Sequence, residues 1–353
     1  MHNILMLGAS YGSLLASKFL LAGHHVSLVC LPAEAHLINA EGFRVRLPLK
    51  GRTDGIEIDS RTLPGKVTAG GTADFDPTHF DLIGLAMQEP QYRAPGVREL
   101  LEAVAISRVP CMSIMNMPPL PYLKRIAGLN PGALSPAYTD ATVWDRFDPA
   151  TVTLCSPDPQ AVRPPEEKVN VLQVTLPTNF KVARFDDERM TSILRELARD
   201  VDAVRMDTPA GPIELPVKFK LHDSIFVPLA KWAMLICGNY RCITESGLCT
   251  AREAVHSNIE ASKSIYNFVN DLCISLGAAP SDLVAFEKYA AAAQSLTRPS
   301  SAARALQAGA HRIERVDKLV RLIAHHRAKS HPALDAIVAL VDRRLEVNRR
   351  KTA

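Results

Sequence analysis

The sequence predicts an α/β fold in two parts: an N-terminal half built on a parallel sheet and an all-α C-terminal half. Three observations carry this prediction. Strand-like and helix-like segments alternate early in the chain, helical patterns fill the region after residue 211, and 353 residues exceed the usual size of one compact core. The Pro- and Gly-rich tract 209–212 separates the halves, so we expect domains at 1–210 and 211–353.

The first elements form a strand–helix–strand unit. We expect a strand at Ile4–Leu7, a turn rich in Gly and Ser, a helix over Gly12–Ala22 and a second strand at Val26–Cys30. Apolar side chains cover overlapping faces of this helix, as packing against a sheet requires. Because a helix joins the two strands, we expect them to run parallel.

The following elements continue this alternation. Two continuous apolar runs flank a helix at Val97–Ile106, and such runs are typical of strands buried on both faces. A region rich in Pro, Asp and Ser, residues 118–165, precedes a further helix at Asp187–Ala203. The additional strands expected in this half are Leu82–Ala86, Pro110–Met115, Thr151–Cys155 and Val169–Thr175.

Beyond the linker tract the pattern is almost entirely helical. Glycine and proline break it at four places, at Gly277, Pro280, Pro299 and Pro332. The helices expected are Asp223–Cys237, Ala251–Leu276, Leu283–Ala292, Ser300–Ala324 and Ala333–Glu346.

The composition is that of an ordinary globular protein, with 47% hydrophobic and 22% charged residues. The net charge of +4 is small, and part of it comes from a C-terminal basic run without interleaved aromatic residues, which is typical of a solvated tail. The longest apolar stretch, near Ala230–Cys237, is too short to span a bilayer. We therefore expect neither nucleic acid nor a membrane as a partner. The basic run comprises Arg343, Arg344, Arg349, Arg350 and Lys351.

The cysteines show no spacing that would serve a metal site or a disulfide framework. They are scattered, odd in number and nowhere arranged as CxxC. The N-terminal residues lack a basic segment and run directly into the first strand, which argues against a signal peptide. We expect a reducing, cytoplasmic location and no metal. The seven cysteines are Cys30, Cys111, Cys155, Cys237, Cys242, Cys249 and Cys273.

The turn after the first strand is the first candidate binding site. Residues 8–13 read GASYGS, where a GxGxxG loop would let backbone amides and a helix N-terminus approach a pyrophosphate. Only Gly8 matches that pattern in register. A plain βα turn without a ligand is the alternative, but the flanking strand and helix favour a dinucleotide site. The residues expected to form it are Gly8, Ser10, Tyr11, Gly12 and Ser13.

The residues after the second strand leave the choice of cofactor open. An acidic residue there binds the ribose 2′-hydroxyl of NAD, whereas an arginine accommodates the 2′-phosphate of NADP. The segment 30–32 offers neither. Glu34, His36 and Arg44 follow closely, although each is more often an ordinary surface residue. The sequence therefore predicts NADP or NAD without choosing between them.

Several segments taken together resemble the ketopantoate reductase family, of the 6-phosphogluconate dehydrogenase-like superfamily. The resemblance covers nearly the whole chain in the expected order. It implies a Rossmann domain that binds NAD(P), a helical domain that holds a small-molecule substrate, and a homodimer. The segments are Gly8–Ala16, Gly23–Val29, Asp81–Gln91, Ser113–Leu123, Lys231–Thr244 and Pro299–Asp317.

In that family a lysine on the first long helix of the helical domain protonates the substrate's carbonyl oxygen, and an asparagine two turns later lines the same pocket. The matching residues are Lys231 and Asn239. In an α-helix eight residues advance about 800°, about 80° beyond two full turns, so the pair would share one face. A lysine snorkelling at the helix edge is the alternative. Leu235 replaces a further asparagine of the family, which implies a less polar pocket.

Two further positions concern the cofactor. The family's nicotinamide-side asparagine corresponds to Asn116, here followed by Met117 in place of glycine. Ligands of open α/β sheets bind at the carboxyl ends of strands, although an asparagine is equally common in plain turns. Gln88 stands where the family has a lysine near the adenosine phosphate. We expect Gln88 to contact the cofactor there. The loss of that lysine, together with that of the arginine after the second strand, argues against strong NADP preference and against ketopantoate as the substrate.

A Ser-Ser element and a later glutamate hold the substrate's carboxylate and hydroxyl in that family. Ser300 and Ser301 match its start, and Ser301 is expected to bind substrate, although the pair also suits a helix N-cap. Glu314 falls one residue beyond the expected place on the predicted helix, which would turn its side chain by about 100°. Its catalytic role therefore depends on a local insertion in that helix.

These expectations combine into an NAD(P)-dependent oxidoreductase that reduces a 2-oxo acid or a related small carbonyl compound, or runs the reverse reaction. The nicotinamide supplies hydride, and Lys231 delivers the proton as general acid. Asn116 orients the nicotinamide or Lys231. Asn239 and Ser301 position the substrate, with Glu314 as an additional contact.

Two alternatives remain open. Opine-type dehydrogenases are similar in plan and use a histidine–aspartate pair, and His222-Asp223 precede the Lys231 helix, although adjacent residues rarely face each other on a helix. A non-catalytic nucleotide- or metabolite-binding protein of the same fold is the second alternative, because fold does not imply function.

Overall fold

The computed structural model describes residues 1–49 and 55–351. The chain divides into two compact units. The first, which we call the sheet unit, comprises Met1–Met87, Gln91–Tyr122 and Val143–Ile225. The second, which we call the helical unit, comprises Gln88–Pro90, Leu123–Thr142 and Phe226–Ala353.

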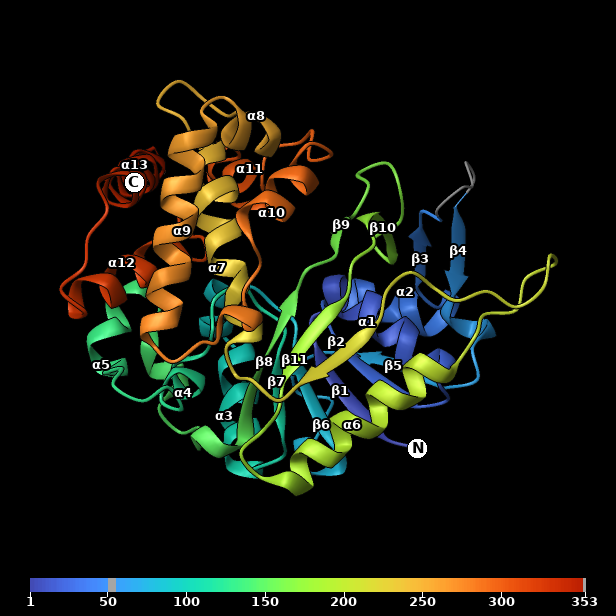
Figure 1. Ribbon diagram of the computed structural model, residues 1–353. Helices are drawn as coiled ribbons and strands as arrows, with labels where there is room; N and C mark the ends of the chain where they lie inside the picture. Colours follow the sequence, from blue (N-terminus) through green and yellow to red (C-terminus); the bar gives the residue numbers. More distant parts are fainter. Residues whose placement is uncertain (50–54, 352–353) are drawn as a thin grey trace. The chain divides into compact units, whose positions relative to one another are not determined.

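The sheet unit is built on an eight-stranded sheet in the order β12-β11-β8-β7-β6-β1-β2-β5 (Figure 1). From β5 to β8 every neighbouring pair is parallel, and β11 runs antiparallel to β8. The predicted parallel sheet is therefore confirmed. The strands are β1 (Asn3–Leu7), β2 (His25–Val29), β5 (Val67–Gly70), β6 (Leu82–Leu85), β7 (Cys111–Ser113), β8 (Val152–Pro157), β11 (Phe180–Ala183) and β12 (Phe219–His222).

The central strands are apolar at successive positions because both faces of the sheet are covered. All four residues of β6 are buried, as are Ile4–Leu7 of β1. Helix α1 (Ala9–Leu21) is buried almost all round, since it packs on β1 and β2 and also contacts α6 (Glu188–Ala203). The other helices of the unit are α2 (Pro32–Glu41) and α3 (Val97–Ser107).

A second, four-stranded sheet, in the order β4-β3-β10-β9, was not predicted, although the strand expected at Val169–Thr175 is its β10. Its strands β3 and β10 contact α1. The segment R-V-R-L of β3 alternates polar and apolar residues, which is the pattern of a half-buried strand and could have revealed it. The strands are β3 (Arg44–Leu47), β4 (Ile56–Asp59), β9 (Gln160–Val162) and β10 (Val171–Leu176).

The helical unit contains the expected helices, with three corrections. The helix predicted over 223–237 begins only at Lys231. The one predicted over 251–276 is broken between α8 and α9, and that over 300–324 between α11 and α12. In the last case the residues between Gln307 and Val316 form a loop, in which Gly309 has φ +90°. The helices are α7 (Lys231–Met234), α8 (Ala251–His256), α9 (Ile259–Ser275), α10 (Phe286–Ala293), α11 (Ser301–Gln307), α12 (Val316–His326) and α13 (Pro332–Arg350), with α5 (Pro131–Leu134) from the earlier segment; α4 (Leu120–Leu123) lies at the unit boundary.

The units differ from the two domains expected from the sequence. Strand β12 pairs in parallel with β11, so the sheet unit continues past residue 210 to Ile225. His222 is the last residue of β12 and Asp223 follows it, so this pair does not lie on a helix, and the helix-based argument against the opine-type alternative does not apply to it.

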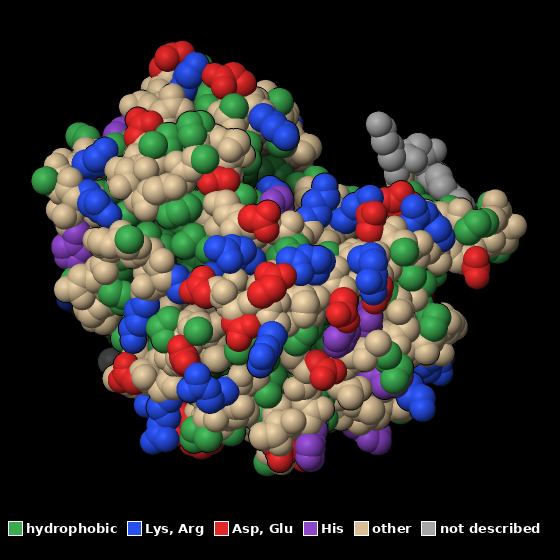
Figure 2. Space-filling view, turned by 60° about the horizontal axis from the view of Figure 1, so that its bottom comes forward, with side chains coloured by type: hydrophobic (Ala, Val, Ile, Leu, Met, Phe, Trp, Pro, Cys, Tyr) green, Lys and Arg blue, Asp and Glu red, His purple; other side chains and the backbone are tan. Residues whose placement is uncertain are grey.

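The surface and the thiols add two observations. On the face drawn in Figure 2, acidic and basic side chains are interspersed and neither sign dominates. No disulfide joins any of the seven cysteines, all of which lie in the described part of the chain. Within residues 1–49 and 55–351, no helix combines the length and apolar character needed to cross a membrane, and no cluster of His, Cys, Asp and Glu suits a metal.

Candidate functional site

The turn between β1 and α1 brings backbone close to backbone. Gly8 has φ +110°, and its amide donates to the carbonyl of Val29 at the end of β2 at 2.9 Å. A Cβ on Gly8 would lie 2.8 Å from the carbonyl oxygen of Ala86, just after β6. A Cβ on Gly12 would lie 2.6 Å from Met6 Cγ, so this glycine lets α1 pack tightly on β1. Gly12 thus allows the helix to pack closely on the strand, although it does not match a glycine of the GxGxxG pattern in register.

The N-terminus of α1 suits an anion. Gly8 is the N-cap and has no side chain to satisfy the first amides of the helix. Those amides lie at the carboxyl edge of a parallel sheet, where a dinucleotide phosphate binds in folds of this class. Ser10 and Tyr11 in the first turn are partly exposed. The Ser13 hydroxyl donates to the carbonyl of Ala9, so it acts within the helix.

The first turn of α2, which follows β2, takes part in an ion pair that the sequence did not reveal. Glu34, on the first turn of α2, is buried and accepts two hydrogen bonds from the guanidinium of Arg163, which follows β9. Burial and the Glu34 carboxylate raise the pKa of the Cys30 thiol to about 12, so this thiol stays protonated. The other two residues considered there lie elsewhere: His36 is exposed, and Arg44 pairs with Glu57 at 3.2 Å.

Asn116 lies three residues beyond β7, at the carboxyl end of that parallel strand, as the sequence predicted. It is partly buried, whereas the neighbouring Met117 is fully buried and fills the place of the family's glycine with an apolar side chain. Asn116 belongs to the sheet unit together with residues 8–13, which we call the nucleotide turn.

Lys231 and Asn239 lie on one continuous helical segment whose second half is not an α-helix. Residues Leu235–Asn239 form a π-turn, in which the amide of Tyr240 donates to the carbonyl of Leu235, five residues earlier. Lys231 and Asn239 are each partly exposed, whereas the residues between them are mostly buried. The predicted angle of about 80° between the pair assumed an unbroken α-helix, and the π-turn changes it.

Two hydroxyl groups tie this segment to the other predicted substrate residues. Ser300 caps α11, accepting from the amide of Ala303 at 3.2 Å, and its hydroxyl donates to the carbonyl of Asn239 at 2.6 Å. The Tyr240 hydroxyl donates to the carbonyl of Glu314 at 2.5 Å. The N-cap alternative therefore holds for Ser300, while Ser301 is exposed on the first turn of α11.

Glu314 lies in the loop before α12, so the predicted 100° rotation on a helix does not apply to it. Its Oε1 accepts from the amide of Glu89 at 3.3 Å. The Tyr240 hydroxyl also accepts from the amide of Val316 at 2.9 Å, which fixes the end of this loop. The catalytic role of Glu314 therefore stays a prediction, because the helix geometry on which it depended is not the observed one.

Glu89 is a buried carboxyl group that sequence reasoning missed. Its carboxylate accepts from the amide and the hydroxyl of Thr139 at 2.8 and 2.9 Å. Burial raises the pKa of Glu89 despite these hydrogen bonds. Its neighbour Gln88, predicted to contact the cofactor, is exposed and lies in the helical unit. A buried, perturbed carboxyl beside Glu314 is typical of a functional region.

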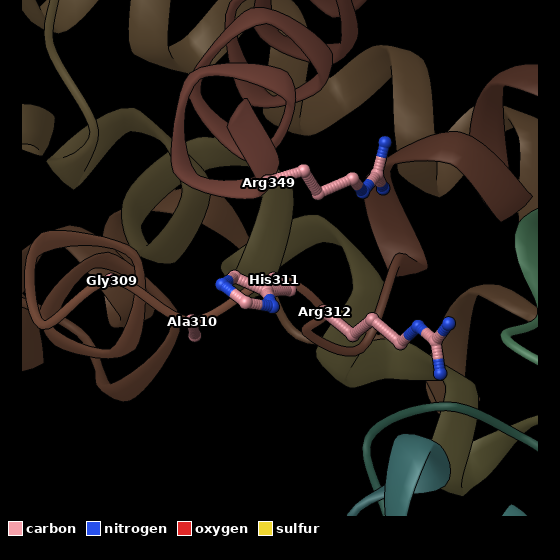
Figure 3. Close-up of a pocket in the computed structure, with 5 residues that line it drawn as sticks. All are labelled: Gly309, Ala310, His311, Arg312 and Arg349. Carbon is pink, nitrogen blue, oxygen red and sulfur yellow. The ribbon is translucent and has the colours of Figure 1, made fainter. Parts of the chain in front are cut away.

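The loop between α11 and α12 also borders a basic hollow of about 600 Å³. Figure 3 shows His311 and Arg312 on this loop and Arg349 on α13 around it. A smaller hollow shares Arg312 and Arg349 and extends to Thr139 and Lys318. Positive side chains therefore gather beside the loop that carries Glu314, where they attract anions.

Lys231 and Asn239 lie on one helical segment, and hydrogen bonds from Ser300 and Tyr240 join the end of that segment to α11 and to the loop that carries Glu314. The structure places the nucleotide turn and Asn116 at the carboxyl edge of the sheet. Sequence reasoning missed Arg163, Glu89, Thr139 and Tyr240, because they act through contacts between residues far apart in the chain. Arg163 binds Glu34, Thr139 binds Glu89, and Tyr240 binds the backbone of Glu314.

Solved structures align with this chain over nearly its whole length. A 2-dehydropantoate 2-reductase from Methylococcus capsulatus is 14% identical, with a TM-score of 0.63 and 96% of each chain covered. D-mandelate dehydrogenase, in a ternary structure with NADH and anilino(oxo)acetate, is 12% identical, with a TM-score of 0.64 and coverage of 98% of this chain and 99% of that one. A dimeric ketopantoate reductase from Staphylococcus aureus is 10% identical, with a TM-score of 0.60 and the same coverage.

No protein-family model and no curated protein matches the sequence. At such low identity the structural likeness establishes the fold. The sheet unit and the helical unit both have counterparts in these enzymes, as the coverage shows. The chain therefore has the fold of the ketopantoate reductases, as the resemblance in its sequence predicted.

Proposed function

We propose that this protein is an NAD(P)-dependent oxidoreductase that interconverts a 2-oxo acid and the corresponding 2-hydroxy acid. The observation that carries the proposal is the glycine turn at the carboxyl edge of the sheet, whose uncapped helix N-terminus suits a dinucleotide phosphate. The full-length likeness to D-mandelate dehydrogenase with NADH and to ketopantoate reductases supports it.

The sheet unit would hold the cofactor. The first amides of α1, next to Gly8, would bind the pyrophosphate, and Asn116 would hold the nicotinamide end. The bound nicotinamide supplies or accepts the hydride. Glu34 lies on the first turn of α2, which follows β2, where the adenosine ribose binds in this class of fold, so Glu34 and its partner Arg163 are the residues to vary when the cofactor choice is tested.

The helical unit would hold the substrate. Lys231 would hydrogen-bond the carbonyl oxygen and donate the proton to it during reduction, since a general acid must lie within hydrogen-bond reach of the atom it protonates. Asn239, Ser301 and Glu314 would orient the polar groups of the acid. The positive side chains beside the Glu314 loop favour an anionic substrate over a neutral ketone.

A thermal-shift titration with NAD, NADH, NADP and NADPH tests the cofactor site, because a ligand that binds only the folded state raises the melting temperature by mass action. We expect one oxidised–reduced pair to give the larger shift. An Arg163→Gln protein then reports whether the Glu34–Arg163 ion pair contributes to the preference between NAD and NADP.

A screen of 2-oxo acids, followed as oxidation of the reduced nucleotide, tests the activity. We expect turnover without an added amine. Turnover only when an amine is present would instead identify an opine-type reaction, and nucleotide binding without any turnover would identify a non-catalytic binding protein.

The assembly that we propose is a homodimer, by analogy with the dimeric ketopantoate reductase from Staphylococcus aureus. Light scattering at several protein concentrations measures it, and a constant monomer mass would contradict it.

A further inference from the structure

Tyr289, on α10, reaches the π-turn through its hydroxyl group. The Tyr289 Oη donates to the carbonyl oxygen of Met234 at 3.2 Å. The tyrosine is buried, and its ring stacks on that of Tyr266 with the centroids 5.3 Å apart. A Cβ built on Gly238 would collide with the Tyr289 hydroxyl oxygen. The hydroxyl therefore occupies the space that the missing side chain of Gly238 leaves.

The π-turn changes which residue lies one helical turn after Met234. In an α-helix the carbonyl of residue 234 pairs with the amide of residue 238, whereas the i→i+5 pattern pairs it with Asn239. Asn239 thus takes the place on the helix that residue 238 would have. Seven α-helical steps from Lys231 advance about 700°, which falls within about 20° of two full turns. The π-turn therefore reduces the angle between Lys231 and Asn239 from about 80° to about 20°.

A widened turn of this kind needs support from outside the helix. π-turns are rare, and they persist where other groups stabilise them, often at functional sites. Here the support comes from two directions: Tyr289 donates to the first carbonyl of the turn, and Ser300 donates to the carbonyl of Asn239 at its end. The Cys242 thiol donates to the Gly238 carbonyl at 3.3 Å.

We propose that Tyr289 is a positioning residue for the reaction: its hydroxyl, admitted by Gly238, stabilises the π-turn that aligns Asn239 with Lys231. This inference rests on the proposed function, because it assigns those two side chains to the substrate. Tyr289 acts through the helix backbone.

The matched control is Tyr266. It is buried, its ring stacks on that of Tyr289, and its hydroxyl donates to the carbonyl of Val284 at 3.0 Å rather than to a carbonyl of the π-turn. Tyr289→Phe and Tyr266→Phe each remove one buried hydroxyl and keep the ring. We expect Tyr289→Phe to raise the KM for the 2-oxo acid at least fivefold with a smaller change in kcat and an unchanged nucleotide affinity. Tyr266→Phe should leave the KM unchanged.

A double variant separates positioning from general loosening. If Tyr289 acts through Asn239, then adding Tyr289→Phe to an Asn239→Ala protein raises the KM no further, because the two changes are coupled. Additive effects of the two substitutions, or equal KM values for the two phenylalanine variants, would overturn the proposal.

Hydrogen exchange of the amides of residues 235–242 gives a readout that needs no turnover. We expect faster exchange in Tyr289→Phe and wild-type exchange in Tyr266→Phe. If the wild-type protein reduces no 2-oxo acid, the proposed function fails and the exchange alone decides. Faster exchange confined to Tyr289→Phe then upholds the support of the turn, and equal exchange in the two variants overturns it.

Discussion

The nucleotide turn and the substrate side of the helical unit are held in place by different means. Around Gly8 the contacts are backbone to backbone, and the geometry depends on an absent side chain and a φ of +110°. Around Asn239 and Glu314 the contacts are single hydroxyl groups that reach carbonyls from other helices. We therefore expect that substitutions that add atoms disturb the first region, and that substitutions that remove a single hydroxyl group disturb the second.

The largest effect is expected at Lys231, which tests whether the substrate side is catalytic at all. Removing a general acid typically costs 10²- to 10⁴-fold in rate, so we expect Lys231→Ala to lower kcat/KM by about that factor. Nucleotide binding, measured by thermal shift, should stay at the wild-type value. The matched control is Lys263→Ala, a surface lysine paired with Glu287, which should keep full activity. Full turnover by Lys231→Ala would remove this residue from the mechanism.

Gly8→Ala tests the sensitivity of the nucleotide turn to added atoms. The new Cβ would meet the Ala86 carbonyl at 2.8 Å in a left-handed backbone conformation, so we expect a loss of about 1–3 kcal/mol in the free energy of unfolding and weaker nucleotide binding. Denaturant unfolding and the thermal-shift titration measure the two effects.

Gly23→Ala is the control for Gly8→Ala. Gly23 has φ +83° but nothing lies within 4 Å of its added Cβ, so it isolates backbone strain from the collision. Equal losses in the two variants would show that the close approach to β6 does not matter.

Ser300→Ala and Ser301→Ala test the second region at adjacent positions. Ser300 loses its N-cap bond and its bond to the Asn239 carbonyl, so we expect a loss of about 0.5–2 kcal/mol in unfolding free energy. Ser301 is exposed, so its removal should leave stability unchanged and raise the KM for the substrate. A stability loss at Ser301 with an unchanged KM would reverse these assignments.

The smallest effect is expected from the pH dependence of the unfolding free energy, through His24 in the sheet unit. Burial lowers the pKa of His24, and the nearby His2 lowers it further, while Asp200 and Glu196 oppose the shift. Its Nδ1 accepts from the amide of His2 at 3.1 Å, which requires that nitrogen to be unprotonated. Because the unfolded chain binds this proton at higher pH than the folded protein, stability is full above about pH 6.5 and falls as the pH drops through the folded pKa.

His24→Gln measures that contribution. The difference in unfolding free energy between pH 7.5 and pH 5.5 should be smaller in this variant than in the wild type. An unchanged difference would assign the acid sensitivity to other groups.

The two regions also differ in how far the sequence predicts them. The strand Ile4–Leu7 and the helix Gly12–Ala22 follow from local periodicity, and the structure confirms both elements, although the helix begins at Ala9, within the predicted turn. In the helical unit the alanine-rich segment 301–310 reads as one long helix with residues 311–324. In the structure α12 begins at Val316, whose amide donates to the hydroxyl of Tyr240, 76 positions away in the chain. No local pattern encodes such a contact.

The same limit explains the residues that were missed. Arg163 reaches Glu34 across 129 positions, and the π-turn depends on a tyrosine 55 positions from Met234. Each of these residues is ordinary in its own sequence neighbourhood. The family resemblance predicts roles for Lys231, Asn239 and Glu314, but the hydroxyl groups that bind the backbone of Asn239 and Glu314 became visible only with the fold.

The interleaving of the two units bears on how the chain is made and dissected. The helical unit is assembled from three separate stretches, and α12 packs on α5, which comes from the stretch Leu123–Thr142. During synthesis the stretch Leu123–Thr142 is made long before α12, with which it packs. Because its contacts join residues far apart in the sequence, we expect the helical unit to fold slowly. A fragment starting at Phe226 would expose the face of α12 that α5 covers, and it is therefore prone to aggregate.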